Sequence, residues 1–385
     1  MARQVIQSVY DLPVMPLTIQ DMTWNKTGTW RYMVPVIRDK IPPCRAACPL
    51  GNPIANVIGM MKRGDMDGAL ALLLRCNPLP GITGRLCYHP CQAKCLRKEL
   101  DSPVAIWTLE RYAADHGVVP RPEKPAATGK RAAVLGSGPA GLTCGFLLAL
   151  NGVDVHILEP AARPGGFLNR VSTDKLEPGV LQREIERLVD VSGLHIETGI
   201  TTLDPAGFDR VMVDESAYDP NEEYAAVINR LCSRLSGRRT PAPLNEAFSG
   251  FKPSQVAHAI GLGLRMAGVV AAELGIALRE QGPDAEGPMI KKEDIQIDRF
   301  QESASAGFSE KNRPLDKAGA MAEAVRCLSC GTCNLCQRCV ISCPDACIDL
   351  DETETRIVLD LYHCKGCGIC AYECPRGVLT MEGEA

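Results

Sequence analysis

Apolar residues recur at helical spacing in three stretches of the first third of the chain. These stretches lie near residues 53–63, 65–76 and 103–116, within a segment, 41–118, that we expect to be a helical domain. Residues 1–40 show no such period, and we expect them to form an arm that lies on another surface of the protein. The aromatic residues of this arm are Tyr10, Trp24, Trp30 and Tyr32.

The hydrophobic pattern then changes to short apolar runs separated by helical stretches. The run RAAVLGSG (131–138) predicts a buried strand, the stretch PAGLTCGFLLALNG a helix, and the run VDVHILEP a second strand. This order predicts a βαβ unit of a parallel sheet. A further helix and strand are expected within 181–200, and another strand at 208–214. The Pro-rich segment VPRPEKPAATGK (119–130) marks the boundary to the helical domain.

A long apolar helix is predicted between residues 251 and 280. It contains a histidine, an arginine and a glutamate, which make it a poor membrane span. Residues 281–318 are charged and contain Gly and Pro, so we expect a linker there. The expected fold class is multidomain α+β, with an N-terminal helical domain, a Rossmann-like α/β domain at 130–280 and a C-terminal α+β domain at 319–385.

The composition is unusual in one residue type, cysteine, and this indicates a class of binding site that the hydrophobic pattern does not. The 385 residues include 19 cysteines, most of them in two blocks, 44–95 and 327–374. A disulfide scaffold is normally short and secreted, whereas this chain is long and begins MARQVIQSVY, without the apolar core of a signal peptide. Clustered CxxC spacings in such a chain predict metal or iron–sulfur sites in a reducing, cytoplasmic compartment.

Charge and histidine content exclude other classes of function. The net charge of −4 and the pI of about 6.0 give no electrostatic reason to expect binding to nucleic acid or to an anionic membrane. The six histidines are scattered, and no Ser/His/Asp or Cys/His arrangement indicates hydrolysis. We therefore expect no catalytic side chain of that kind.

The C-terminal cysteines repeat the spacing CxxCxxCxxxCP, which is typical of bacterial ferredoxins with two 4Fe–4S clusters. A tight CxxCxxC loop directs three thiolates at one cluster, and the fourth cysteine, before proline, reaches the other cluster. One expected ligand set is Cys333, Cys336, Cys339 and Cys374. The other expected set is Cys364, Cys367, Cys370 and Cys343. Two zinc sites are the alternative, although zinc rarely uses this doubled pattern.

Within this repeat, the stretch CKGCGICAYECPRGVLTM (364–381) resembles the small ferredoxin-like subunit of 2-oxoacid:ferredoxin oxidoreductases. The resemblance covers about 60 residues, and it implies a catalytic 2-oxoacid oxidoreductase as a partner.

The first cysteine block resembles the N-terminal domain of the glutamate synthase small subunit, which dihydropyrimidine dehydrogenase shares. The segments that carry the resemblance are PPCRAACP, NPLPGITGRLCYHPCQAKC and SPVAIWTLERYAADHG, in the family's order. In that family the helical domain holds two 4Fe–4S clusters. The family's CLxCG motif is missing before PPCRAACP, but AEAVRCLSCG (322–331) resembles it and lies near the other end of the chain.

The resemblance implies two further ligand sets. The first expected set joins both ends of the chain and consists of Cys44, Cys95, Cys327 and Cys330. The second contains Cys48, Cys87 and Cys91, with Glu110 in TLERY as the fourth ligand, since this family can use a side-chain oxygen there. Cys76 is an alternative fourth ligand of this set. Glu110 could also be an ordinary helix carboxylate that faces solvent and binds no cluster. If Glu110 is the ligand, four cysteines remain as small buried apolar residues: Cys76, Cys144, Cys232 and Cys347.

The glycine-rich loop after the first predicted strand is a dinucleotide fingerprint in its required context. Its glycines allow a tight turn and close approach of a pyrophosphate to the helix N-terminus, and Glu159 ends the next strand, where it can accept from ribose hydroxyls. The following Arg163-Pro-Gly165-Gly166, and a final helix in SGFKPSQVAHAIGLGLRMAGVVAAEL, resemble the FAD half of the same reductase family, which favours FAD over NAD. The residues expected at the cofactor are Gly136, Ser137, Gly138, Pro139, Ala140, Gly141, Glu159, Pro160, Arg163, Gly165, Gly166, Leu168, Ser254, Gln255 and Val256.

Two departures from the family concern the nicotinamide and flavin sites. In the glutamate synthase small subunit a second Rossmann unit, which binds NADPH, lies inside the FAD domain. No second strand–GxGxxG–helix pattern occurs between residues 170 and 250, so we expect this unit to be deleted. The family's Thr-Gly after the last predicted strand is replaced by Asp214-Glu215, and the usual Gly-Asp before the final helix is absent.

The sequence therefore predicts an electron-transfer iron–sulfur flavoprotein with about four 4Fe–4S clusters and one FAD. We expect it to be a subunit of a larger oxidoreductase that exchanges electrons with a catalytic subunit and with ferredoxin or NAD(P). A self-contained NAD(P)H:acceptor oxidoreductase is the first alternative. An assembly protein with a vestigial flavin site is the second.

Overall fold

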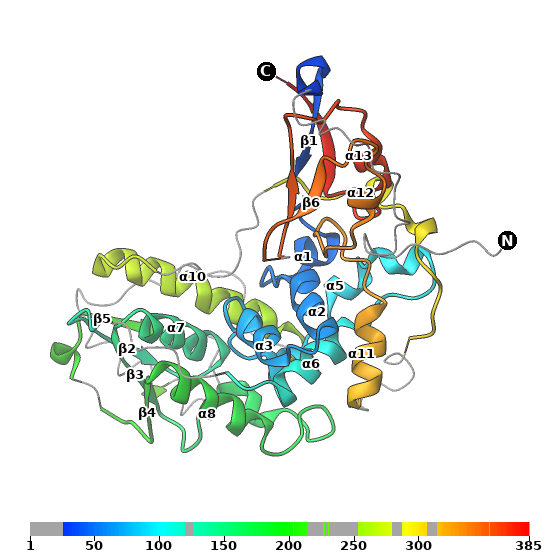
Figure 1. Cartoon of the computed structure of the whole chain (residues 1–385). Coiled ribbons are helices and arrows are strands. Elements are labelled where there is room, and N and C mark those ends of the chain that lie inside the picture. Colours follow the sequence, from blue (N-terminus) through cyan, green and yellow to red (C-terminus); the bar gives the residue numbers. More distant parts are fainter. Residues whose placement is uncertain are drawn as a thin grey trace.

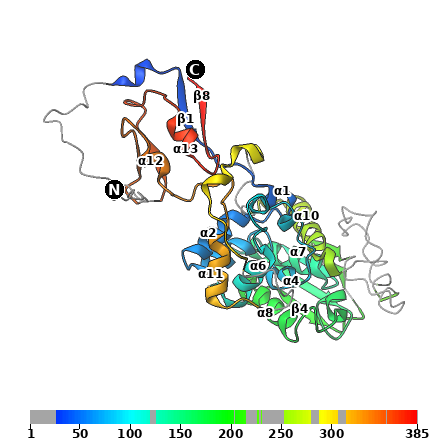
Figure 2. The ribbon, with the colours of Figure 1, turned by 90° about the vertical axis from the view of Figure 1, so that its right-hand side faces the viewer.

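The computed structural model has two lobes, and helix α1 (Pro43–Ala47) lies where they meet (Figures 1 and 2). The larger lobe holds the helical and α/β domains, and the smaller one, the ferredoxin lobe, holds the C-terminal cysteine repeat. The fold class expected from the sequence is confirmed. The structure describes residues 26–119, 126–202, 204–214, 226–227, 230, 253–278, 287–305, 314–353 and 355–384. Tyr10, Trp24, Cys232 and Glu215 lie outside the described residues.

Short helices build the helical domain. They are α1, α2 (Ile54–Lys62), α3 (Met66–Leu74), α4 (Pro80–Leu86), α5 (Pro90–Ala93), the 3-10 helix η3 (Leu96–Glu99) and α6 (Ile106–His116). The helices α2, α3 and α6 lie where the apolar period predicts them. The helices α4 and α5 are too short to show a period, and each begins with a proline, whose missing N–H is not needed in the first turn.

The α/β domain is a four-stranded parallel sheet in the order β4-β3-β2-β5. Its elements are β2 (Arg131–Leu135), α7 (Pro139–Leu150), β3 (Asp154–Glu159), α8 (Val180–Ser192), β4 (His195–Thr198) and β5 (Arg210–Val213). The 3-10 helices η4 (Gly166–Arg170) and η5 (Pro205–Gly207) lie in its loops. Because β2 and β3 run parallel across α7, the glycine-rich loop lies at the carboxyl edge of the sheet, as a dinucleotide fold requires.

The last helix of this domain, α10 (Val256–Leu274), packs against α7 after the 3-10 helix η7 (Pro253–Gln255). The contact is close, since a β-carbon on Gly263 would lie 2.3 Å from the carbonyl oxygen of Ala140. Among the described residues α10 is the single helix that is long and apolar enough to cross a membrane, and its most apolar window is 61% buried inside the protein. This burial makes α10 a core helix of the larger lobe.

The helical and α/β domains share one hydrophobic core. Leu79, Ile82 and Leu86 of the helical domain belong to the same buried cluster as Leu148 of α7 and Ile260 of α10. A salt bridge adds to this interface, since Arg85 of α4 pairs with Glu177, just before α8. The expected boundary at 119–130 therefore separates two sequence segments that fold against each other.

The ferredoxin lobe consists of two short hairpin-like sheets and two short helices. Its elements are β6 (Ile348–Leu350), β7 (Ile357–Leu359), β8 (Leu379–Gly383), α12 (Arg338–Ile341) and α13 (Ile369–Glu373). The partner of β8 is β1 (Met33–Ile37), which pairs with it antiparallel from Met33–Gly383 to Ile37–Leu379. The segment expected to be an irregular arm thus supplies a strand of this lobe, and the 3-10 helix η2 (Thr27–Trp30) precedes it.

The segment before the C-terminal repeat also packs more closely than a linker. Helix α11 (Lys317–Val325) contacts α2 and α6, and its Ala320 and Ala324 are buried in the core of the helical domain. The 3-10 helices η8 (Lys292–Asp294) and η9 (Ile297–Arg299) lie in the expected linker, where Ile290 and Ile295 are buried against Leu328. Part of the expected linker at 281–318 therefore packs against the residues that precede the C-terminal repeat.

Candidate functional site

Cysteines from both ends of the chain line one cavity in the helical domain. Cys44 lies in α1, Cys95 lies between α5 and η3, and Cys327 and Cys330 follow α11. All four line the cavity together with apolar side chains of α2 and α6. Burial raises the pKa of the Cys44 thiol, and the neighbouring charges of Cys95, Cys327 and Cys330 raise it further. We call Cys44, Cys95, Cys327 and Cys330 the shared set.

A buried network of charged side chains fixes α11 beside this cavity. Arg326 donates to the carboxylates of Glu323 at 2.6 Å and Asp101 at 2.9 Å, and Arg97 donates to Asp101 at 2.8 Å. Glu323 also accepts from the backbone N–H of Ala105 at 2.8 Å. Two guanidinium groups therefore face two carboxylates with further hydrogen bonds, which offsets the cost of burying their charges. Arg326 directly precedes Cys327, so the network determines where that cysteine lies.

A second group of cysteines lies beside a buried carboxylate. Cys48 ends α1, Cys87 ends α4 and Cys91 lies in α5. Burial is the largest cause that raises the pKa of Cys87, to about 12, and the charge of Glu110 raises it further. The charge of Glu110 also contributes to the raised pKa values of Cys48 and Cys91, after burial. We call Cys48, Cys87, Cys91 and Glu110 the carboxylate set.

Glu110 is a buried side chain and not a solvated one. It lies inside α6 and is 9% exposed, and it accepts hydrogen bonds from Asn77 at 2.8 Å and from Thr83. Burial raises the pKa of Glu110 to about 7, although these hydrogen bonds lower it. The rival Cys76 is also buried, but after burial its pKa responds to Arg45 and Arg75. Glu110 is thus a buried carboxylate whose charge raises the pKa values of all three cysteines.

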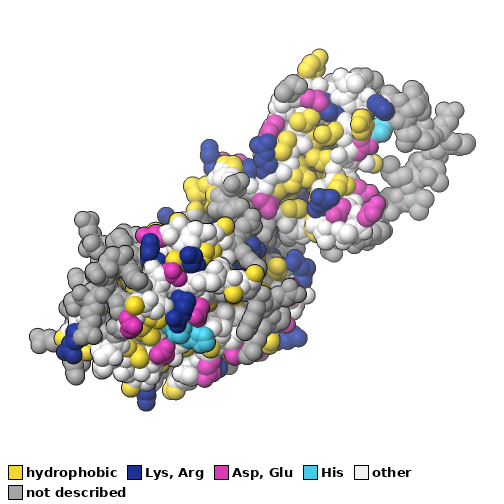
Figure 3. Space-filling view, turned by 90° about the vertical axis from the view of Figure 1, so that its left-hand side faces the viewer, with side chains coloured by type: hydrophobic (Ala, Val, Ile, Leu, Met, Phe, Trp, Pro, Cys, Tyr) yellow, Lys and Arg dark blue, Asp and Glu magenta, His cyan; other side chains and the backbone are white. Residues whose placement is uncertain are grey.

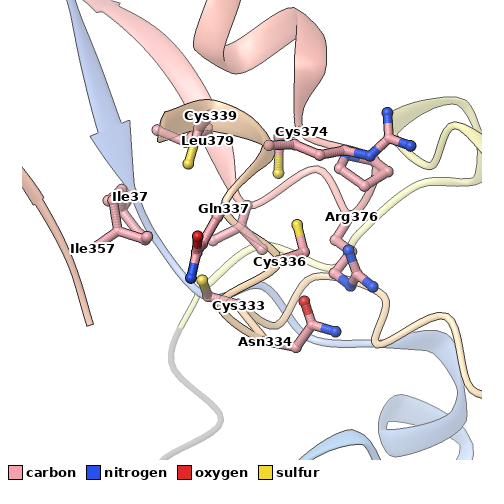
Figure 4. Close-up of a pocket in the computed structure, with 13 residues that line it drawn as sticks. Ile37, Cys333, Asn334, Cys336, Gln337, Cys339, Ile357, Cys374, Arg376 and Leu379 are labelled. Atoms are coloured by element: carbon pink, nitrogen blue, oxygen red, sulfur yellow. The ribbon is translucent and has the colours of Figure 1, made fainter. Parts of the chain in front are cut away.

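The C-terminal repeat forms two cavities in the ferredoxin lobe. In the first, Cys333, Cys336 and Cys339 of one repeat meet Cys374 of the other, and Figure 4 shows their sulfur atoms directed into the same space. Ile37 of β1 and Leu379 of β8 line this cavity. In the second cavity, Cys364, Cys367 and Cys370 meet Cys343, and the buried Cys347 lies at its wall. We call Cys333, Cys336, Cys339 and Cys374 the inner set, and Cys343, Cys364, Cys367 and Cys370 the outer set.

Short stretches of chain join neighbouring sets, and Cys339 and Cys343 link the inner set to the outer set. Cys330 of the shared set and Cys333 of the inner set are three residues apart, so their α-carbons lie within about 11 Å of each other. Cys91 and Cys95 connect the carboxylate set to the shared set in the same way. The order is therefore outer, inner, shared and carboxylate set. In the described part of the chain, no group of three or more His, Cys, Asp or Glu converges closely enough to hold a single metal ion.

The glycine-rich loop connects β2 to α7 as the fingerprint requires. Gly136 has a φ of 97°, which favours glycine, and a β-carbon on Gly141 would lie 2.6 Å from the carbonyl oxygen of Gly136. Ser137 ties this loop to the second glycine motif, since its carbonyl oxygen accepts from the N–H of Gly165 at 3.1 Å. Leu168, which follows that motif in η4, is buried. The two motifs named from the sequence thus lie side by side.

Two buried carboxylates flank this loop. Glu159 is fully buried and accepts from the backbone N–H of Ser137 at 2.8 Å and of Ala161 at 2.8 Å, where it holds the loop in place. Asp214, directly after β5, accepts from the backbone N–H of Gly141 at 2.8 Å in the first turn of α7. Sequence reasoning noted Asp214 only as a departure from the family. Its role as a cap of α7 requires knowing that β5 lies next to β2.

The start of α10 lies beside the carboxylate set. The backbone N–H of Tyr88, the residue after Cys87, donates to the carbonyl oxygen of Ser254 at 3.3 Å, and the Tyr88 ring stacks on His258 with centroids 5.8 Å apart. Val256, where α10 begins, is buried. The helix that was expected to face the flavin therefore starts next to a cysteine set. Pro160 and Arg163 lie between β3 and η4, in the segment that leads to the second glycine motif.

Three protein-family models match successive parts of the chain. Residues 37–120 match a family described as dihydropyrimidine dehydrogenase domain II, 4Fe-4S cluster. Residues 134–199 match an NAD(P)-binding Rossmann-like domain, and residues 357–380 match a 4Fe-4S binding domain. The iron–sulfur and dinucleotide domains expected from the sequence are thus confirmed as domain types.

Curated relatives match about half of the chain. The NADPH glutamate synthase small chain of Bacillus subtilis is 34% identical over 201 residues, which are 50% of this chain and 38% of that protein. The chain is thus similar to the glutamate synthase small chain over half of its own length. It is also 30% identical to the NADP(+)-dependent formate dehydrogenase subunit beta of Moorella thermoacetica, over 55% of this chain and 32% of that protein. The putative oxidoreductase AegA of Escherichia coli is 33% identical over 53% of this chain.

The chain spans less than two fifths of the length of these relatives, 38% of the small chain and 32% of the formate dehydrogenase subunit. Within the described residues 170–202 and 204–214, the chain forms α8, β4 and β5 and no second glycine-loop dinucleotide unit. The expected loss of the NADPH unit stays a prediction, because most of residues 215–250 lie outside the described residues.

Proposed function

We propose that the chain is an electron-transfer subunit of an oxidoreductase complex, with four 4Fe–4S clusters and one FAD. When bound, such clusters exchange one electron at a time and a flavin exchanges one or two. The observation that supports this proposal is the row of four ligand sets between the surface of the ferredoxin lobe and the start of α10. The protein's contribution is to hold these sets close together and to set their charge and burial.

The residues of each set fit a 4Fe–4S cluster. Buried thiols with raised pKa values stay protonated until a metal centre replaces the proton, as iron–sulfur ligands do. The four sets supply fifteen cysteines and one carboxylate, Glu110, which is already oriented by Asn77 and Thr83. Glu110 is proposed as the fourth ligand of the carboxylate set.

The glycine-rich loop fits the pyrophosphate of a dinucleotide, and we propose that FAD binds there. The α7 N-terminus provides the positive end of a helix dipole, and Glu159 lies at the end of β3, where ribose hydroxyls are bound in this fold. Because α10 begins beside Cys87, the isoalloxazine end of such a cofactor would point toward the carboxylate set.

The outer set is the proposed point of exchange with a partner. Cys367 of this set is exposed, and large apolar side chains next to the set are exposed as well: Ile369 at 40%, Tyr362 at 69% and Tyr372 at 72%. Figure 3 shows hydrophobic side chains gathered on one face of the ferredoxin lobe. The proposed partner is the catalytic subunit of a 2-oxoacid oxidoreductase, on the resemblance of residues 364–381.

A second candidate is a self-contained NAD(P)H:acceptor oxidoreductase. It is favoured by the match of residues 134–199 to an NAD(P)-binding domain and by a relative named NADPH-Fe(3+) oxidoreductase subunit beta, from Geobacter sulfurreducens, which is 35% identical over 37% of this chain. In this case the nicotinamide would meet the flavin directly.

Two experiments on anaerobically purified protein test the proposal. Native purification should recover the chain with a catalytic oxidoreductase subunit, and the isolated chain should contain flavin and iron in a ratio that fits one FAD and four clusters. Stopped-flow mixing of the isolated chain with NADH or NADPH should leave its visible absorbance unchanged. Rapid bleaching would favour the second candidate, and a preparation without flavin and iron would favour an assembly protein.

A further inference from the structure

Two cationic side chains lie between the shared set and the inner set. The ammonium group of Lys62, at the end of α2, donates to the carbonyl oxygen of Cys327 at 2.8 Å. Arg376 follows Cys374 by two residues and lines the cavity of the inner set, where Figure 4 shows it near Cys336. Both are largely withdrawn from solvent: Arg376 is 9% exposed.

The two cations act on the same cysteines and on each other. Burial lowers the pKa of Lys62, and the charge of Arg376 lowers it further, whereas the charges of Cys327 and Cys330 raise it. The charge of Arg376 in turn lowers the pKa of Cys330, against the larger effect of burial. The backbone carbonyl oxygen of Arg376 accepts from the N–H of Gly331 at 2.9 Å, which ties it to the link between the two sets.

These cations differ from the other basic side chains near the shared set. Arg97 and Arg326 are paired with Asp101 and Glu323, so their charges are balanced locally. Among the residues that the structure describes, no carboxylate pairs with Lys62 or with Arg376, and the Nε of Arg376 has no hydrogen-bond partner. The guanidinium of Arg376 instead lies over the ring of Phe300, 5.4 Å from its centroid. Two uncompensated positive charges therefore remain at the junction.

We propose that Lys62 and Arg376 raise the reduction potentials of the shared-set and inner-set clusters above the potential of the outer-set cluster. This inference rests on the proposed function. One-electron reduction adds one negative charge to a cluster site, and the electron comes from the neighbouring cluster, which is oxidised by one electron. A fixed positive charge stabilises the reduced form, and burial limits its screening by solvent and salt.

The charges around the outer set support this order of potentials. Lys365 there is paired with Asp345 at 2.6 Å, and Asp360 lies nearby with its carboxylate bound to His363. The outer set thus has a compensated lysine and exposed acidic groups, whereas the junction has the half-buried Lys62 and the buried Arg376 without acidic partners in the described chain. An electron that enters at the ferredoxin lobe would be held at the shared set before it reaches the flavin side.

The test is a redox titration followed by electron paramagnetic resonance on the full chain, purified without oxygen. The variants Lys62→Gln and Arg376→Gln remove one charge each and keep a polar side chain. Lys62→Gln should shift the midpoint of the shared-set cluster to a more negative potential, and Arg376→Gln should shift the midpoints of the shared-set and inner-set clusters. The other midpoints should stay in place. Lys62→Arg and Arg376→Lys should restore the wild-type midpoints. The control is Lys291→Gln, whose side chain is 72% exposed, and it should leave every midpoint unchanged.

Unchanged midpoints in both Gln variants, with full iron content, would overturn the inference. The inference would also be overturned if the midpoints of all clusters shifted equally. It would likewise be overturned if both Gln variants lost iron while Lys62→Arg and Arg376→Lys kept all of theirs, since the charges would then serve folding or assembly. The iron and flavin contents of the wild-type chain show whether only this inference has failed or the proposed function has failed as well. If the wild type holds its clusters and its flavin, the proposed function stands even where this inference fails.

Discussion

The guanidinium of Arg326 donates to the carboxylate of Asp101 at 2.9 Å, across 225 residues of sequence. It also donates to the backbone carbonyl oxygens of Ser102 at 2.6 Å and Ser303 at 3.2 Å. Arg326 therefore joins three segments of the chain at the point where α11 ends and the Cys327–Cys330 link begins. This contact explains how a cysteine pair near the C-terminus is held against the N-terminal helical domain.

Replacing Arg326 with Met should detach this cysteine pair. The change leaves Asp101 and Glu323 buried with fewer partners, and loss of one member of a buried ion pair costs about 3–5 kcal/mol. We expect the iron content to fall by about a quarter, since one of four cluster sites would lose two ligands. Iron analysis of the anaerobically purified variant measures this loss of iron. The control Arg338→Met, on the ferredoxin lobe, should retain its iron, and full iron in the Arg326 variant would show that the network does not hold the shared set together.

Replacing Glu110 with Gln should remove or alter the cluster of the carboxylate set. The amide keeps the shape of the side chain and bonds to Asn77 or Thr83, but it lacks the charge that an iron ligand needs. The spectrum of one cluster should disappear or change, and the other three should remain. Cys76→Ser is the control and should leave all spectra as they are. If Cys76→Ser has the larger effect, Cys76 is the ligand.

A Gly141→Ala variant should lose flavin and keep its iron. The added β-carbon would lie 2.6 Å from the carbonyl oxygen of Gly136 and 2.7 Å from the carboxylate of Asp214, so the loop must shift away from its fingerprint geometry. The matched control is Gly268→Ala in α10, where a β-carbon meets no atom within 4 Å and should stabilise the helix by about 0.5–1 kcal/mol. Assays of the flavin and iron contents of both variants measure this effect. Normal flavin content in Gly141→Ala would argue against a pyrophosphate at this loop.

Strand β1 should be needed for the clusters of the ferredoxin lobe. Ile37 lines the inner-set cavity, and Ile37→Asp places an unpaired charge there, which costs several kcal/mol. We expect loss of the inner-set and outer-set clusters, about half of the iron, with flavin retained. Met33→Asp, at the exposed end of the same strand, is the control and should change neither. Retention of all iron by Ile37→Asp would show that the lobe forms its clusters without β1.

Features with a local signature could be predicted from the sequence, and features that depend on distant pairing could not. The doubled CxxCxxC spacing predicted the inner and outer sets, since it reflects the reach of one tight loop. The segment Met33–Ile37 gave no strand signal, because it is short, contains Pro35, and its partner β8 begins at Leu379. The packing of residues 287–305 has no local signature, because apolar residues such as Ile290 are few there and are buried only when the fold places Leu328 beside them.

The candidate site also has features that the sequence predicts and features that only the fold reveals. The membership of Cys327 and Cys330 followed from the resemblance of AEAVRCLSCG to a motif normally found at the other end of the chain. The network that holds them could not be predicted, since Arg97, Asp101 and Arg326 are ordinary charged residues until the fold brings them together. The role proposed for Lys62 and Arg376 could not be predicted from the sequence either, because it depends on which groups the fold places beside them.

If thiolates from both ends of the chain hold one cluster, a double-substitution cycle at Cys44 and Cys330 should show it. Two ligands of the same cluster give non-additive losses, because removal of either already destroys the site. The Cys44→Ser, Cys330→Ser and double variants should therefore each lose the same resonance and about the same quarter of the iron. If the two single variants lose different resonances, and the double variant loses about half of the iron, the two cysteines belong to separate clusters and the account is wrong.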